Sequence, residues 1–127
     1  MADVNRGNRP LSPHLQIYKP ELHMVLSALH RITGIALTGG AVLVVLWLFA
    51  AASSPDAFAL VDGLMTSWIG NLVLLLCTVI LWYHAVNGIR HLAWDAGFGF
   101  EKDMIDRSGK VVLAVTATLT LLTIIFA

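Results

Sequence analysis

Residues 63–95 read "GLMTSWIGNLVLLLCTVILWYHAVNGIRHLAWD". The first 21 of them, from Gly63 to Tyr83, contain no charged residue and no histidine. An α-helix rises about 1.5 Å per residue, so about 20 apolar residues can cross the hydrocarbon core of a bilayer. The stretch therefore predicts a membrane-spanning helix. It also raises the question of why two histidines and an arginine follow directly, where an apolar environment makes them costly.

Two further apolar segments accompany this one, at residues 32–52 and 111–127. Only 13% of the 127 residues are charged, against about a quarter in typical soluble domains, and the mean hydropathy is +0.78. The last segment has 17 residues, so we expect its helix to begin near Ser108. The sequence predicts an all-α membrane protein with spans at about 25–52, 63–91 and 108–127.

Basic residues are distributed unevenly around these spans. They occur before or at the start of the first span (Arg6, Arg9, Lys19, Arg31) and after the second (Arg90, Lys102, Arg107, Lys110). The loop "AASSPDAFALVD" at 51–62 has none. Because cytoplasmic loops are enriched in Lys and Arg, we expect a cytoplasmic N-terminus and a periplasmic C-terminus. The net charge of zero gives no bias toward nucleic acid.

The segments outside the spans suggest docking rather than a separate domain. Residues 1–20 contain three prolines and predict an irregular cytoplasmic arm, followed by the membrane anchor at 21–127. Residues 95–109 are charged and glycine-containing, and they predict a long loop. The first residues lack the h-region of a signal peptide and the Arg- and Ser-rich start of a transit peptide, which favours a bacterial inner membrane over a mitochondrial one. The single Cys77 allows no intrachain disulfide and no cysteine-ligated cluster.

His84 is the most informative titratable residue. With the second span centred near residue 78, it lies about 9 Å from the midplane, still inside the hydrocarbon. No Asp or Glu lies one turn away, so two interpretations stay open: a hydrogen bond to a neighbouring helix, or a ligand. Gly88, on the same face, opens a recess that a porphyrin or a packed helix can fill. His91 lies further toward the cytoplasm, at a depth that suits a haem propionate. For Arg90 and Asp95 we expect solvated anchors.

The segment "SALHRITG" at 27–34 starts the first span and carries a second polar group. Ser27, Arg31 and Gly34 share one helix face, and His30 is one residue off it. Since the first two helices are antiparallel, this group and His84 lie in the same leaflet. Arg31 could hold a propionate, polarise a quinone carbonyl or simply anchor the helix at the interface.

The segments "RPLSPHLQIYK" at 9–19, "SALHRITG" at 27–34 and "HAVNGIRHLAWD" at 84–95 together resemble a known family. The chain looks like the cytochrome b membrane-anchor subunit of succinate dehydrogenase, which is respiratory complex II. The resemblance covers nearly the whole chain, including its three spans.

The resemblance implies a specific set of partners and sites. The chain would be one anchor in a multi-subunit helical bundle with a second membrane-anchor subunit, an iron–sulfur subunit and a flavoprotein subunit. His84 would be one axial ligand of haem b, and the second anchor would supply the other. Ser27 and Arg31 would line the ubiquinone site, and His30, Arg31 and His91 would lie near the haem propionates. No catalytic residue for succinate is expected in this chain.

Two other hypotheses remain from the residues alone. One is a self-contained small cytochrome b in which His30 and His84 ligate the same iron, although His30 is expected nearer the interface. The other is a haem-free structural anchor of a related quinone oxidoreductase.

Overall fold

The computed structural model describes residues 14 and 16–126, and this part of the chain contains four α-helices and no strand. They are α1 (Leu22–Ser53), α2 (Pro55–Met65), α3 (Trp68–Asp95) and α4 (Lys102–Phe126). Helices α1, α3 and α4 are each long and apolar enough to cross a membrane. The predicted all-α membrane fold is confirmed. Of the expected arm at 1–20, residues 1–13 and 15 lie outside the described part.

The surface of these helices is apolar rather than polar. Large hydrophobic side chains such as Leu48, Ile69 and Phe126 are exposed along the length of all three long helices. In water such a surface would drive association, but in a bilayer it faces lipid tails or neighbouring membrane helices. The chain is therefore a multi-pass membrane protein whose polar interior is confined to a few places.

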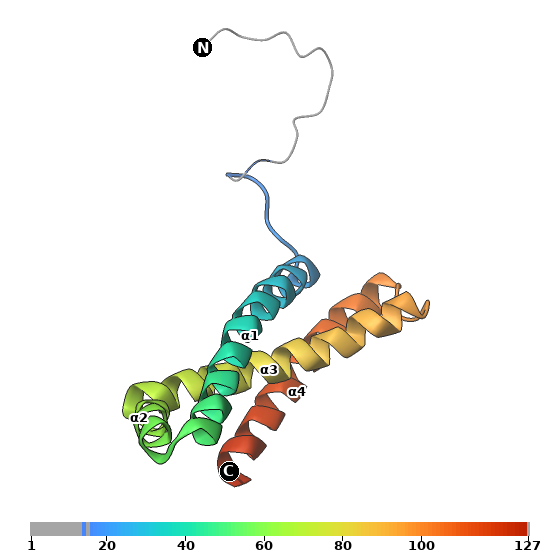
Figure 1. Cartoon of the computed structure of the whole chain (residues 1–127). Coiled ribbons are helices and arrows are strands. Elements are labelled where there is room, and N and C mark those ends of the chain that lie inside the picture. Colours follow the sequence, from blue (N-terminus) through green and yellow to red (C-terminus); the bar gives the residue numbers. More distant parts are fainter. Residues whose placement is uncertain (1–13, 15, 127) are drawn as a thin grey trace, which may run out of the picture.

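A short helix that the sequence did not predict joins α1 to α3. Ser54 is in an extended conformation, and its side chain accepts a hydrogen bond from the backbone N–H of Ala57 at 3.2 Å. Pro55 follows at the first helical position, where its missing N–H costs nothing, so the turn residues "SSPD" begin helix α2. Figure 1 shows α2 at the end of the bundle where α1 ends and α3 begins.

The loop predicted at 95–109 is shorter, because α3 ends at Asp95 and α4 already begins at Lys102. Gly97 and Gly99 have φ values of +88° and +80°, which favour glycine, and they turn the chain. Gly109, in contrast, lies buried inside α4. A Cβ there would come within 2.9 Å of Leu26 Cδ1, so this glycine permits helix packing and makes no turn.

The core lies where the start of α1, the end of α3 and the start of α4 meet. Leu26, Tyr83 and Val112 are buried together there, one from each helix. The Tyr83 hydroxyl donates a hydrogen bond to the Leu26 carbonyl oxygen at 2.6 Å. This contact fixes the rotation of α3. The next residue, His84, also contacts α1, through the His30 carbonyl oxygen.

Candidate functional site

Three histidines from two helices meet beside this core. The ring of His30 on α1 stacks on that of His84 on α3, with centroids 4.0 Å apart and planes 12° apart. His91 lies next to His30, with ring centroids 4.9 Å apart. All three residues are half-buried. The structure thus brings together the three histidines that the sequence singled out.

Glycines allow this close approach. A Cβ at Gly88 would lie 3.6 Å from His30 Cε1, so the recess predicted beside His84 is filled in this chain by the His30 ring. A Cβ at Gly34 would lie 3.1 Å from His84 Cε1, which is tighter than ordinary van der Waals contact. The lack of a side chain at residue 34 therefore lets the His84 ring lie this close to the α1 backbone.

One nitrogen of His84 is held by α1 and the other is not. Nδ1 lies 3.1 Å from the His30 carbonyl oxygen and 3.1 Å from Thr33 Oγ1. Within the described residues, Nε2 makes no hydrogen bond. An imidazole with one nitrogen fixed and the other free is the usual arrangement of a metal-ligating histidine.

These residues fit the haem that the resemblance implies. His84 Nε2 offers a single nitrogen ligand. In the described part of the chain, Nδ1 of His30 is buried without a hydrogen-bond partner, and an unpartnered polar atom of this kind is suited to a polar group such as a propionate. Among the described residues, no group of three or more His, Cys, Asp or Glu could hold a metal ion alone. A cofactor that takes one axial ligand from this chain is consistent with that arrangement.

The ring geometry argues against two axial ligands from this chain. Axial histidines point their nitrogens at one iron from opposite faces of a porphyrin. His30 and His84 are instead stacked face to face, 4.0 Å between centroids, with no space for a macrocycle between them.

Ser27 and Arg31 lie on α1, in the same turns as His30. Ser27 is half-buried and Arg31 is exposed. In the part of the chain that the structure describes, neither side chain forms a hydrogen bond or an ion pair. The structure therefore places them next to the histidine cluster along the helix, with no hydrogen bond to it among the described residues.

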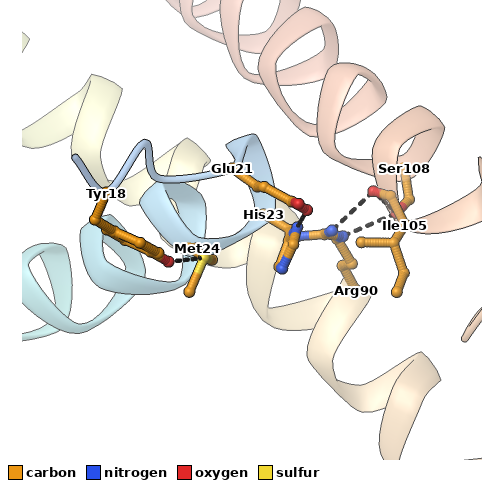
Figure 2. A network of polar contacts seen from close by, with 7 residues as sticks. All are labelled: Tyr18, Glu21, His23, Met24, Arg90, Ile105 and Ser108. Atoms are coloured by element: carbon orange, nitrogen blue, oxygen red, sulfur yellow. Dashed lines mark hydrogen bonds and ion pairs between the residues drawn. The ribbon is translucent and has the colours of Figure 1, made fainter. Parts of the chain in front are cut away.

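Arg90 is not the solvated anchor that the sequence predicted. It is only 6% exposed. Its Nε donates to Ser108 Oγ and its Nη2 to the Ile105 carbonyl oxygen, both at 2.9 Å (Figure 2). Its guanidinium carbon also lies 4.1 Å from the ring centroid of Trp94. Buried arginine needs such partners, and here it ties α3 to α4. Asp95 is exposed, as expected.

Sequence reasoning missed a polar face of α3. This face holds Tyr83, Asn87, Arg90 and Trp94, which recur at helical spacing one residue behind the histidine face. Arg90 bonds to α4, whereas the Tyr83 hydroxyl bonds to α1. The i, i+4, i+7 and i+11 spacing of the four residues could have revealed them. Thr33 was also missed, although it lies three residues after His30 in the same motif.

Comparison with known proteins agrees with this architecture. A family model described as "Succinate dehydrogenase/Fumarate reductase transmembrane subunit" matches residues 5–123. The succinate dehydrogenase cytochrome b556 subunit of Paracoccus denitrificans is 49% identical over 125 residues, covering 98% of this chain and 96% of the relative.

More distant relatives come from bacteria and mitochondria. The cytochrome b556 subunit of Rickettsia prowazekii is 38% identical over 117 residues, covering 91% of this chain and 90% of its own length. The mitochondrial cytochrome b560 subunit of Mus musculus is 43% identical over 122 residues, covering 88% of this chain and 69% of the relative. With the family model spanning nearly all of the sequence, the chain belongs to the succinate dehydrogenase/fumarate reductase transmembrane subunit family.

Proposed function

We propose that this chain is a haem b-binding membrane anchor of succinate dehydrogenase that also contributes to the ubiquinone-reduction site. The observation that carries the proposal is the histidine cluster between α1 and α3, in which His84 Nε2 is free of hydrogen bonds within the described residues. The relatives' names, cytochrome b556 and b560 subunits of succinate dehydrogenase, support it.

His84 is the proposed axial ligand from this chain, and a second membrane anchor supplies the other. Haem b, when bound, carries single electrons. The protein's part is to present Nε2 and to provide polar groups for the propionates. His30, whose Nδ1 has no partner among the described residues, and His91 beside it are suited to that role, and Arg31 adds a fixed positive charge on the neighbouring surface.

Ser27 and Arg31 are the proposed ubiquinone ligands. A guanidinium and a hydroxyl can both donate hydrogen bonds to a quinone carbonyl oxygen, and they stabilise the negative charge that develops there during reduction. The exposure of Arg31 supports this role, because an exposed side chain can reach a molecule outside this chain. The rest of the pocket, and the electrons, come from the iron–sulfur and second anchor subunits.

The proposed location is the bacterial inner membrane, with the N-terminus and the histidine cluster on the cytoplasmic side. The excess of Lys and Arg around the start of α1 and between α3 and α4 supports this orientation. The iron–sulfur and flavoprotein subunits would dock at that end. A periplasm-specific reporter fused after residue 127 should be active, and activity of a cytoplasm-specific reporter there would reverse the orientation.

The test of the haem assignment is His84→Ala in the assembled complex. We expect loss of the low-spin b-type absorption spectrum, because an axial ligand is removed. His23→Ala is the matched control, since His23 lies on the same side of the chain but pairs with Glu21 outside the cluster (Figure 2).

The other outcomes would reject the assignment of His84 or point to a different function. An unchanged spectrum in His84→Ala would show that His84 is not the ligand. A native complex without haem would identify the chain as a structural anchor. Haem bound by the chain alone, and lost in either His30→Ala or His84→Ala, would identify a self-contained cytochrome.

A further inference from the structure

The contacts of His84 with α1 determine which of its nitrogens carries the proton. His84 Nδ1 lies 3.1 Å from the backbone carbonyl oxygen of His30, an atom that can only accept a hydrogen bond. A neutral imidazole can satisfy this contact only if Nδ1 is protonated. The lone pair then lies on Nε2, which is the nitrogen available to a metal.

Thr33 completes the arrangement. Its hydroxyl donates a hydrogen bond to the same His30 carbonyl oxygen at 2.9 Å. With its proton used there, Thr33 Oγ1 meets His84 Nδ1 at 3.1 Å as an acceptor. The Nδ1–H group is thus shared between two oxygens of α1, one from the backbone and one from a side chain.

Gly34 leaves room for the His84 ring to lie close to these two oxygens. Its missing side chain lets His84 Cε1 approach the α1 backbone, as described above. At this depth in a membrane, water is scarce and cannot replace a lost acceptor. The orientation of the His84 ring therefore depends on groups from α1 itself.

We propose that Thr33 is a positioning residue for His84: its hydroxyl, together with the His30 carbonyl oxygen, fixes the tautomer and the ring plane in which Nε2 faces the haem iron. This inference rests on the proposed role of His84 as axial ligand. Hydrogen bonding at the nitrogen that does not bind the metal also raises the basicity of a ligating histidine, and a more basic ligand stabilises ferric over ferrous iron. Thr33 should therefore lower the reduction potential of the bound haem.

The experiment compares Thr33→Val, Thr33→Ser and Thr38→Val in the intact complex. Valine keeps the branched shape of threonine but removes the hydroxyl, whereas serine keeps the hydroxyl. Thr38 is the matched control, because it lies on α1 and its hydroxyl, within the described residues, bonds only to the Gly34 carbonyl oxygen of its own helix. The readouts are the haem midpoint potential, the ferric low-spin EPR spectrum and the rate of haem transfer to excess apomyoglobin.

In Thr33→Val we expect a low-spin haem with a more positive midpoint potential, altered EPR g-values and about tenfold faster haem loss, the usual effect of removing an outer partner of a metal ligand. Thr33→Ser and Thr38→Val should match the wild type. Thr33→Ala repeats the test without the branched methyl group, in case valine impairs assembly.

Two failures can be told apart. If His84→Ala abolishes the spectrum while Thr33→Val and Thr33→Ala retain the wild-type potential and haem-transfer rate, the role of Thr33 is overturned and the haem assignment stands. If His84→Ala retains the spectrum, the assignment of His84 itself is wrong, and the inference about Thr33 falls with it.

Discussion

At the scale of single residues, two arginines have opposite environments. Arg31 on α1 is exposed, whereas Arg90 on α3 is buried between α3 and α4. A buried arginine whose donors are already used by Ser108 and the Ile105 carbonyl oxygen is a structural cross-link. An exposed arginine beside a histidine cluster is free to bind a ligand. This contrast favours Arg31 for chemistry and Arg90 for packing.

Arg31→Leu should therefore lower quinone reduction about tenfold to a hundredfold, the equivalent of one hydrogen bond to a charged donor. Succinate oxidation with an artificial soluble acceptor should stay nearly intact, because it bypasses the membrane site. Arg31→Lys keeps the positive charge, so its rate of quinone reduction should fall less than that of Arg31→Leu. Both rates are measured on the purified complex. Equal loss of both activities would indicate failed assembly, and normal quinone reduction would remove Arg31 from the site.

The sequence predicted some residues of the site well because membrane depth is readable from position along a helix. His84 and His91 share a face by spacing alone, and the structure places both beside His30. The burial of Arg90 could not be predicted in this way. One partner, Ile105, lies in a segment that was expected to be loop, and the other, Ser108, was expected only as the start of the last span, so nothing in the sequence placed an acceptor near Arg90.

At the scale of helices, the contact between α1 and α4 depends on one glycine. Gly109 is buried, and a Cβ there would meet Leu26 Cδ1 at 2.9 Å and Leu22 Cδ2 at 3.5 Å. Leu26 is itself 1% exposed and has little room to move. The side chain that residue 109 can carry is therefore limited by the leucines of α1.

Gly109→Leu should destabilise the complex by about 1–3 kcal/mol, the usual cost of overpacking, whereas Gly109→Ala adds only one methyl group and should cost less. Thermal denaturation of the assembled complex measures both. Gly63→Leu is the control, since a Cβ at Gly63 on α2 would meet no described atom within 4 Å beyond its chain neighbours and the nearby backbone of its own helix. Equal melting temperatures for Gly109→Leu and Gly63→Leu would contradict the proposed contact.

Helix ends were harder to predict than helix existence. Hydropathy located three apolar segments, but the chain continues as helix beyond them wherever capping groups and packing allow. The glycines at 97, 99 and 109 all looked like loop residues. Only the first two have positive φ, and the third is a packing residue whose partner, Leu26, lies far earlier in the chain, on α1.

At the scale of the whole molecule, the fold class followed from composition, but the packing partners did not. Many large apolar side chains remain exposed on α1, α3 and α4. Lipid can cover them, and so can another subunit, because lipid tails are as apolar as leucine and give helices no hydrophobic reason to associate. What is specific to this chain is the polar cluster of His30, His84 and His91, where Nε2 of His84 has no hydrogen bond within the described residues.

This incompleteness predicts that the chain expressed alone will be poor in haem. A low-spin b haem requires two strong axial ligands, and His30, stacked on His84, is not placed to provide the second. Pyridine haemochrome assay of the purified chain should give well under one haem per polypeptide. Co-expression of the wild-type chain with the second anchor should restore haem binding. Co-expression of the His84→Ala variant with the second anchor should not. Stoichiometric low-spin haem in the chain alone would instead require both ligands to come from it, and hence a rearrangement that separates the stacked rings.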